Sequence, residues 1–385
     1  MTMTSARTNS FVARPIEQLV SEISALHQQF DATAAESEEL GDAPQVLVDL
    51  MRQIRVPMIK APLEVGGDRL LLADQCRYFT ALSYSNPTAA WTGFNHAGAS
   101  AAAGSRLSDE GVELLFGSDP SPFLAAVAAP TGTFTRVDGG ILMNGTWNYA
   151  SGVRHADWAM LTAIEASEQP SVTLAIIRTA EATVHGEWNV MALKGTGSVS
   201  ITANDVFVPT ALTVNPMEPP KRGGAMYGLN YPVFVAGENL GFTFGTCQRF
   251  IDELVVYARG KARGFDGRLA DRGAFQYELG RSSQQLKAVQ AHALATLASV
   301  DEVMENGGEF TVRDEAGVTA MTAYCTETAV SAISRLMSFA GAGALFNSSP
   351  LQRCFRDAQG SAQHLVATNQ SLDKYGAALL ADVHS

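Results

Sequence analysis

The pattern of apolar and polar positions divides the chain into three parts. Between Pro15 and about Leu115, apolar residues recur at three- and four-residue spacing, which is typical of amphipathic helices. After Pro120 the pattern changes to alternating or continuous apolar runs with Gly, Asp and Asn turns, which favours antiparallel strands as far as Pro209. Helical spacing returns at Val235 and continues almost to the end of the chain. The sequence therefore predicts helices, then a sheet, then helices again.

These changes of period predict an α+β protein with defined segments. We expect a disordered N-terminus (1–14), an N-terminal helical domain (15–120), a central antiparallel β-barrel or sandwich domain (121–220) and a C-terminal four-helix bundle (221–385). The bundle helices are expected over 238–263, 276–307, 318–341 and 351–380, where short loops favour an up-and-down arrangement. The Pro- and Gly-rich stretch MEPPKRGGAMYGLNYP is expected to connect the sheet to the bundle.

Composition and charge exclude several classes of function. The net charge of −12 disfavours nucleic-acid binding, because phosphate backbones require a basic surface. The N-terminus lacks an apolar core of signal-peptide length, and charges interrupt every apolar stretch well short of the ~18 residues that a membrane helix needs. The four cysteines are scattered without a CxxC pair, which indicates free thiols in a reducing cytoplasm and disfavours a zinc site.

The stretch 144–161, NGTWNYASGVRHADWAML, combines strand spacing with polar chemistry. Two apolar runs flank an Ala-Ser-Gly corner, which predicts a β-hairpin-like turn that presents the Ser151 hydroxyl beside the aromatic residues Trp147 and Tyr149. A hydroxyl framed by aromatic rings suits a flat, conjugated ligand better than it suits a phosphate or a metal ion. The corner is therefore the first candidate binding site.

The order of domains and four local motifs resemble the acyl-CoA dehydrogenase superfamily over nearly the whole chain. The motifs are NGTWNYASGVRHADWAML, LKGTGSVSITANDVFVP, YARGKARGF and SPLQRCFRDAQG. The resemblance implies a flavin between the β domain and the bundle, often within a tetramer. It also implies that Ser151 lies near the flavin N5 atom and that Tyr149 lies against the flavin ring, with Ser198 close by.

Two departures from the dehydrogenase pattern favour a different branch of the superfamily. Many acyl-CoA dehydrogenases carry a catalytic Glu after the last-helix Arg-Asp motif, whereas here Arg356-Asp357 is followed by His364 and by no Glu. The sheet reads AVAAPTGTF instead of a Thr-Glu-Pro signature. Both features resemble the two-component (group D) flavin-dependent monooxygenases, as does His96 on the small-residue helix in WTGFNHAG.

The chemistry of that branch gives these residues roles. Its members use reduced FMN or FAD from a separate reductase, and the flavin forms a C4a-hydroperoxide with O2 that survives only where water is excluded. Ser151 would hold the N5 proton, while Trp147, Tyr149 and Trp188 would keep the pocket dry. His364 is the predicted base that activates a phenol- or indole-like substrate, and His96 is expected to support the peroxide or the substrate.

Candidates for the flavin phosphates lie in the bundle segment. Arg263, in the basic run that begins at Arg259, is the candidate cation, and Gly341 and Gly343 are the candidate backbone cradle. The alternative interpretations are a solvated helix face and a helix–helix turn. No GxGxxG follows a strand, so an NAD(P)H site is not predicted, which favours a partner reductase.

The leading hypothesis is the oxygenase component of a two-component flavin monooxygenase, acting with O2 on a small aromatic or heteroaromatic substrate. It is expected to be a cytoplasmic homotetramer or dimer that binds neither nucleic acid nor membranes and needs no metal. One alternative is an FAD-dependent acyl-CoA dehydrogenase with its base elsewhere in the chain. Another is a non-catalytic member that uses the bundle as a scaffold.

Overall fold

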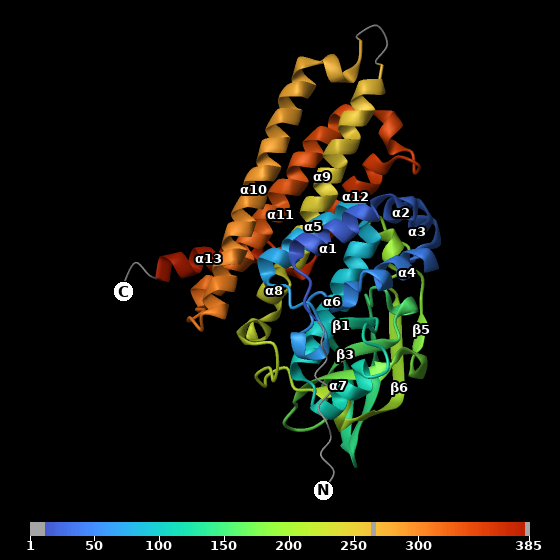
Figure 1. Cartoon of the computed structure of the whole chain (residues 1–385), viewed down its shortest axis with the longest axis vertical. Coiled ribbons are helices and arrows are strands. Elements are labelled where there is room, and N and C mark those ends of the chain that lie inside the picture. The colour runs from blue at the N-terminus through green and yellow to red at the C-terminus, as the bar shows by residue number, and fades with distance from the viewer. Residues whose placement is uncertain (1–11, 263–266, 382–385) are drawn as a thin grey trace.

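The computed structural model describes residues 12–262 and 267–381, and the chain there folds into helices, one sheet and further helices (Figure 1). The prediction of an α+β fold with a central, largely antiparallel sheet is confirmed. The N-terminal part consists of α1 (Ile16–Ala25), α2 (His27–Ala32), α3 (Ala34–Leu40), α4 (Gln45–Gln53), α5 (Leu72–Ser85), α6 (Pro87–Arg106) and α7 (Asp109–Phe116). These helices pack against both the later helices and the sheet.

Local sequence signals fix the start of the two helices nearest the sheet. Asn86 caps α6, because its side chain accepts a hydrogen bond from Ala89 N–H, and Pro87 follows at the first helical position. Ser108 caps α7 by accepting from Gly111 N–H. The first predicted helix is divided, since α1 ends at Ala25 and α2 begins two residues later.

The strands of the described chain form one sheet in the order β5-β6-β2-β1-β3-β4-β7. They are β1 (Leu124–Val137), β2 (Gly140–Trp147), β3 (Trp158–Glu165), β4 (Val172–Arg178), β5 (Thr183–His185), β6 (Ser200–Pro209) and β7 (Thr213–Val214). The expectation of purely antiparallel pairing is wrong at one point, because β1 and β3 run parallel. A tight turn at Gly139 joins β1 to β2, which pairs with one edge of β1. The chain then crosses over, and β3 pairs with the other edge of β1.

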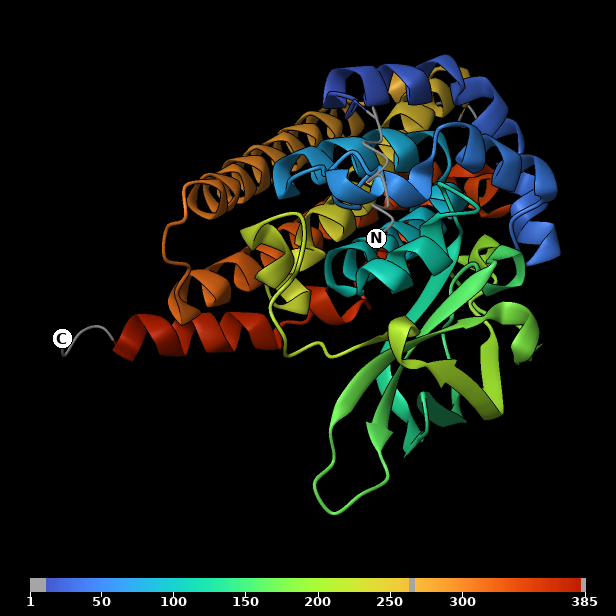
Figure 2. The same ribbon diagram turned by 60° about the horizontal axis from the view of Figure 1, so that its bottom comes forward.

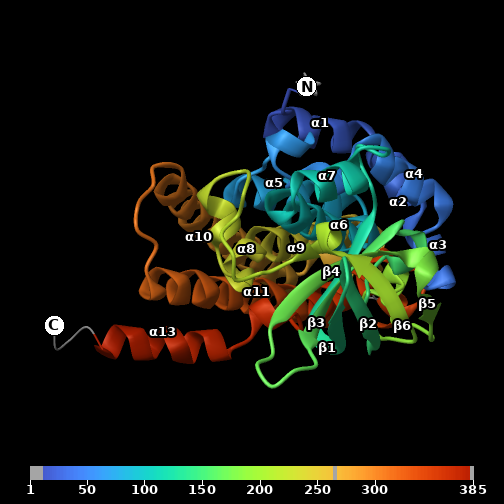
Figure 3. The ribbon, with the colours of Figure 1, turned by 90° about the horizontal axis from the view of Figure 1, so that it is seen from below.

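The C-terminal part contains α8 (Tyr231–Phe234), α9 (Ala236–Gly260), α10 (Gly273–Glu305), α11 (Val312–Ala340), α12 (Pro350–Ser361) and α13 (Gln370–Ala381). The last predicted bundle helix is not continuous. It breaks after Ser361, where the short 3-10 helix η10 (Leu365–Ala367) begins with His364 as its N-cap. Figures 2 and 3 show α13 extending away from the rest of the molecule toward the C-terminus.

The helix α9 packs closely on α5 through glycines at four-residue spacing. A β-carbon at Gly237 would lie 2.3 Å from the Leu72 carbonyl oxygen, and one at Gly241 would lie 2.5 Å from the Cys76 carbonyl oxygen. Since real β-carbons do not approach carbonyl oxygens this closely, a larger residue at either position would push the two helices apart.

A buried ion pair lies between the N-terminal helices and α9. Lys60 Nζ is 2.9 Å from Glu238 Oε2, and both side chains are completely buried. The same ammonium group donates a hydrogen bond to the Phe234 carbonyl oxygen and lies 3.5 Å from the centre of the Phe234 ring. Burial lowers the pKa of Lys60 and raises the pKa of Glu238, so each side chain depends on the other for its charge.

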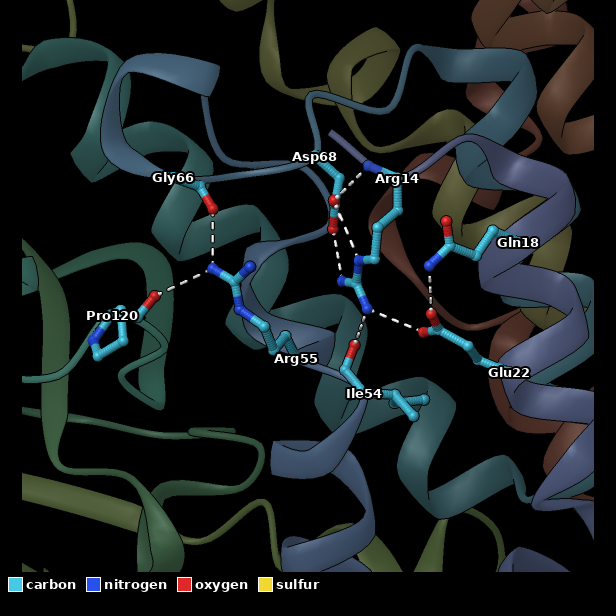
Figure 4. Close-up of polar contacts among 8 residues, drawn as sticks. All are labelled: Arg14, Gln18, Glu22, Ile54, Arg55, Gly66, Asp68 and Pro120. Carbon is cyan, nitrogen blue, oxygen red and sulfur yellow. Dashed lines mark hydrogen bonds and ion pairs between the residues drawn. The ribbon is translucent and has the colours of Figure 1, made fainter. Parts of the chain in front are cut away.

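The N-terminal segment is anchored at Arg14 (Figure 4). Its guanidinium lies 2.6 Å from Asp68 Oδ2 and 2.9 Å from Glu22 Oε2, and it also donates to the Ile54 carbonyl oxygen. Arg14 is therefore ordered, although the predicted disordered terminus included it. The rest of that prediction, residues 1–11, lies outside the described residues.

Within the described chain, no helix is both long enough and apolar enough to cross a membrane. All four cysteines are free and buried. The same part of the chain contains no group of three or more His, Cys, Asp or Glu side chains arranged to hold a metal ion.

Candidate functional site: a hydroxyl chain at an aromatic cavity

The Ser151 corner is the connection that carries the chain from β2 across to β3. The prediction of a hairpin-like turn there is wrong, because β2 and β3 lie on opposite edges of β1 and do not pair with each other. Tyr149 and Gly152 both adopt left-handed backbone conformations, with φ of 65° and 72°. A β-carbon at Gly152 would lie 2.6 Å from His96 Nε2, so this position requires glycine for both its conformation and its space. The turn holds Ser151 with only 6% of its surface exposed.

Three hydroxyl groups form a continuous chain from this corner. Ser151 Oγ lies 2.8 Å from Ser198 Oγ, which lies 2.7 Å from Thr196 Oγ1. The chain ends where Thr196 Oγ1 donates to the Leu193 carbonyl oxygen at 2.8 Å. Ser198, predicted from the sequence as a neighbour of the cofactor, is thereby brought into direct contact with Ser151.

Only one direction of donation satisfies all three hydrogen bonds. A carbonyl oxygen can only accept, so the Thr196 proton points to Leu193, and Ser198 must donate to Thr196. Ser151 must then donate to Ser198. The remaining lone pairs of Ser151 Oγ are therefore free to accept a hydrogen bond from a ligand.

Ser151 and Ser198 line a cavity of about 980 Å³. The cavity lies between α6, the sheet, the connector from Pro216 to Val235, and η10. Its walls are largely aromatic and aliphatic, and they include Trp91, Phe94, Tyr231 and Phe234. A volume of this size, with a few convergent polar groups, suits a flat ring system together with a second small molecule.

The structure places His364 on the cavity wall, as the sequence predicted for a residue of the site. Its ring packs edge-on against Trp91, with 5.7 Å between centroids, and in a tilted arrangement against Phe94, with 5.4 Å between centroids. Burial lowers the pKa of His364 to about 4, so the imidazole is neutral at pH 7. Val366 N–H points to its Nδ1 at 3.5 Å, a contact at the limit of a hydrogen bond, so Nδ1 is the unprotonated nitrogen and is only weakly engaged.

His96 does not line the cavity, in contrast to the expectation that it supports the substrate. Its fully buried ring packs on Phe123 and places Nε2 3.3 Å from His155 Nε2, behind the Ser151 corner. The residue before it in α6, Asn95, does line the cavity. Its side chain accepts from Ala126 N–H and donates to the Ala126 carbonyl oxygen, which fastens β1 to α6.

The predicted aromatic wall is only partly present. Tyr149 and Trp188 both line the cavity, with their rings edge-on at 6.3 Å, and Tyr149 remains 72% exposed. Trp147 is wholly buried within the sheet, where its indole N–H donates to the Thr162 carbonyl oxygen at 2.7 Å. Trp147 is not among the residues that line the cavity.

The candidate phosphate-binding residues are not brought to this cavity. Gly341 and Gly343 lie at the end of α11, where Gly343 adjoins the Tyr257 hydroxyl and Lys261. Neither glycine lines the cavity. Arg263 lies outside the described residues.

Sequence reasoning missed the structural role of the Arg-Asp motif in α12. Asp357 Oδ1 accepts a hydrogen bond from Leu193 N–H at 2.7 Å, and Arg356 pairs with Glu38 at 2.6 Å. Gly360 allows the same loop to approach, because a β-carbon there would lie 2.9 Å from the Leu193 side chain. The motif therefore holds the residue whose carbonyl oxygen terminates the hydroxyl chain.

Comparison with known proteins supports the fold assignment. Residues 241–369 match the family described as acyl-CoA dehydrogenase, C-terminal domain. The chain also superposes on the structure of XiaF from Streptomyces sp. in complex with FADH2 and glycerol, with a TM-score of 0.85, 23% identity, and coverage of 95% of this chain and 96% of that one. The protein thus has the acyl-CoA dehydrogenase fold.

The sequence relatives point to one branch of that fold. A pigment production hydroxylase of Rhodococcus erythropolis is 25% identical over 91% of this chain and 92% of its own length. The oxygenase component of an FADH2-dependent resorcinol hydroxylase from Rhizobium sp. is 24% identical over 91% of both chains. The resemblance to the flavin-dependent monooxygenase branch is therefore confirmed.

Proposed function

We propose that this protein is the oxygenase component of a two-component flavin-dependent monooxygenase. It would take reduced FMN or FAD from a separate NAD(P)H-dependent reductase and oxygenate a small aromatic or heteroaromatic substrate. The observation that carries the proposal is the direction of the hydroxyl chain. Reduced flavin carries a proton on N5 and needs an acceptor there, and Ser151 Oγ is available only as an acceptor.

The cavity fits such a cofactor in its chemistry as well as its size. Ser151 and Ser198 supply polar oxygens at one end, and Tyr149 and Trp188 supply aromatic faces beside them. When bound, the reduced flavin supplies the electrons that activate O2. The residues of the chain would orient the ring, hold its N5 proton at Ser151 Oγ and exclude water through the apolar walls.

His364 is the proposed base for the substrate. The imidazole of His364 is neutral and lies on the cavity wall, so it can accept the proton of a phenol hydroxyl or an indole N–H. Loss of that proton makes the aromatic ring of the substrate electron-rich. The resorcinol hydroxylase among the relatives supports a phenol-like substrate. His96 would act only through the Ser151 corner, since its ring packs behind that turn.

The cavity also bears on the alternative, an acyl-CoA dehydrogenase. That reaction requires a carboxylate close to the flavin to remove the α-proton of the thioester. Among the described residues, none that line the cavity is Asp or Glu. The oxygenase proposal needs no such group.

Oligomeric state and location complete the proposal. We infer a homotetramer or dimer, because α10, α11 and the following turn leave large side chains exposed, including Tyr277, Tyr324 and Phe346. Free, buried thiols are compatible with the reducing cytoplasm.

The decisive test is performed with reduced flavin supplied under anaerobic conditions. The protein should bind reduced FMN or FAD more tightly than the oxidised form, and admission of O2 with a phenolic substrate should give one hydroxylated product per O2 consumed. Reduction of bound FAD by an acyl-CoA without O2 would instead establish the dehydrogenase. If neither form of flavin binds, the non-catalytic scaffold is correct.

A further inference from the structure

Arg106 is a cation on the cavity wall that the proposed reaction does not use. It is the last residue of α6 and lines the cavity on the same helical face as Phe94, Asn95 and Ala102. Phe94 contacts His364, and twelve residues further along a helix correspond to roughly 18 Å. Because helical side chains lean toward the N-terminus of their helix, the guanidinium extends from the C-terminal end of α6 toward Phe94 and His364.

The hydrogen bonds of Arg106 leave its charge uncompensated. Its guanidinium donates to the Tyr227 carbonyl oxygen at 2.6 Å and to Ser105 Oγ at 3.2 Å, and both acceptors are neutral. The ion pairs of the described residues do not include Arg106, whereas the neighbouring Arg222 pairs with Asp109. Burial alone lowers the pKa of Arg106, with no carboxylate offsetting it. A partly buried cation without a counter-ion is costly, which favours an anionic ligand.

The rest of the cavity would accept an anion at this place. Apart from Arg106, the ionisable residues that line it are the neutral His364 and the tyrosines Tyr149, Tyr227 and Tyr231. The guanidinium has five N–H donors, and the Tyr227 carbonyl oxygen and Ser105 Oγ take only two of them. An entering carboxylate therefore meets one cation and no fixed negative charge among the described lining residues.

Resting on the proposed function, we propose that Arg106 binds the carboxylate of an elongated aromatic substrate whose reacting ring lies at Ser151 and His364. The backbone rise of roughly 18 Å between Phe94 and Arg106, shortened by the reach of the Arg106 side chain, leaves room for an acid of two rings or for a ring with an extended acidic side chain. A flavin phosphate has the same anionic chemistry and is the competing source of the negative charge.

A matched pair of probes tests the subsite. The probes are 4′-hydroxybiphenyl-4-carboxylate and the corresponding carboxamide, which have the same shape and differ in charge. Their binding to the protein with reduced FMN is measured anaerobically by calorimetry. The wild-type protein should bind the carboxylate at least about tenfold more tightly than the carboxamide, because hydrogen bonds to charged groups contribute more than neutral ones.

Substitutions at Arg106 should remove this preference without changing the carboxamide affinity. Arg106→Gln should bind both probes equally, and Arg106→Lys should retain part of the preference. Arg222→Gln is the control, since that residue is paired with Asp109 and does not line the cavity. Thermal unfolding of each variant shows whether the fold is retained, and Arg106→Lys remains informative if Arg106→Gln does not fold.

Two results would overturn the proposal. One is an absence of preference for the carboxylate in the wild-type protein. The other is a loss of reduced FMN binding in Arg106→Gln with no loss for lumiflavin, which lacks the phosphate; this result would assign Arg106 to the cofactor. If the carboxylate preference is present but neither probe nor any phenol is hydroxylated, the proposed function fails while the anion subsite stands.

Discussion

Leu193 N–H donates a hydrogen bond to Asp357 Oδ1, and the carbonyl oxygen of the same Leu193 terminates the hydroxyl chain that begins at Ser151. One residue thus joins the bundle helix α12 to the candidate cofactor site. Trp188 Nε1–H donates to the same carbonyl oxygen at 2.9 Å, so three parts of the chain meet there. Damage to α12 should therefore appear in flavin binding.

Substitution of Asp357 should separate its charge from its hydrogen bond. Burial raises the pKa of Asp357 to about 6, so the folded protein retains this proton at pH values where the unfolded chain has lost it. The stabilisation that comes from keeping Asp357 protonated in the folded protein is fully present below about pH 4 and is lost as the pH rises to about 6. Asp357→Asn keeps the acceptor oxygen and should gain on the order of 2 kcal/mol relative to the wild type over that interval.

Urea unfolding at pH 4, 5 and 6.5 measures this difference. Asp357→Ala, which cannot accept from Leu193 N–H, should weaken reduced-flavin binding, whereas Asp357→Asn should preserve it. Parallel stability curves for the wild type and Asp357→Asn would contradict the assigned pKa.

Thr196→Val should reduce the preference for reduced over oxidised flavin by about tenfold, the value of one neutral hydrogen bond. Valine is close in shape to threonine but cannot accept a hydrogen bond from Ser198. Ser198 can then donate to Ser151 instead, and the Ser151 hydroxyl is free to act as a donor to the ligand. The two dissociation constants are measured by flavin fluorescence and by anaerobic absorbance titration. Thr322→Val is the control, because that buried hydroxyl donates only within α11. An unchanged ratio in Thr196→Val would refute the assigned direction of donation.

His364→Gln should lower the rate of hydroxylation by about 10²- to 10⁴-fold while O2 consumption continues with release of H2O2. Because burial lowers the pKa of His364 to about 4, the base is already neutral above pH 5, and the wild-type rate should be flat from pH 6 to 8. Protonation of the His364 imidazole should remove activity only as the pH falls toward 4. Stopped-flow measurements and product analysis across this range provide the test.

The exposed His185, which bonds Thr202 at 2.7 Å, provides a control for His364. His185→Gln should leave the coupling of O2 to product unchanged. An ionisation near pH 6.5 in the wild-type hydroxylation rate that vanishes in His364→Gln would contradict the neutral resting state of His364.

Removal of one member of the buried Lys60–Glu238 pair should be far more harmful than removal of both. Lys60→Met leaves an uncompensated buried carboxylate and should cost about 3–5 kcal/mol of unfolding free energy. The double variant Lys60→Met with Glu238→Leu should recover most of that loss. Urea unfolding of both single variants and the double variant forms the cycle. Additive losses would show that the two side chains are not coupled.

Local patterns predicted a turn at Ser151 and much of the fold, but they wrongly made the turn a hairpin, whereas β1 separates the two flanking strands. The turn residues and the strand period placed Ser151, and the helical spacing placed the long helices α9, α10 and α11. Ser198 was expected near the cofactor, but its bonds to Ser151 and Thr196 were not predicted, because the three residues meet only through pairing between β2 and β6. Periodicity predicts a strand but not its neighbour, which is also why the parallel pairing of β1 with β3 was missed.

The error at His96 has a simple geometric cause. Successive residues of a helix are separated by about 100° around the axis, so His96 points away from the cavity that the adjacent Asn95 faces. The break before His364 was missed for a different reason. The residues from Ala362 to Leu365 fit the helical period, and only tertiary contacts with Trp91 and Phe94 show that the chain turns there.

The walls of the cavity differ in how freely they can vary during evolution. The hydroxyl corner is constrained by the sheet on both sides and by a glycine that no other residue can replace. The opposite wall comes from the irregular connector between Pro216 and Asn230, whose conformation is not set by strand pairing. Loops of this kind tolerate substitution and insertion. The connector wall can therefore vary by substitution or insertion without disturbing the hydroxyl corner on the opposite side of the cavity.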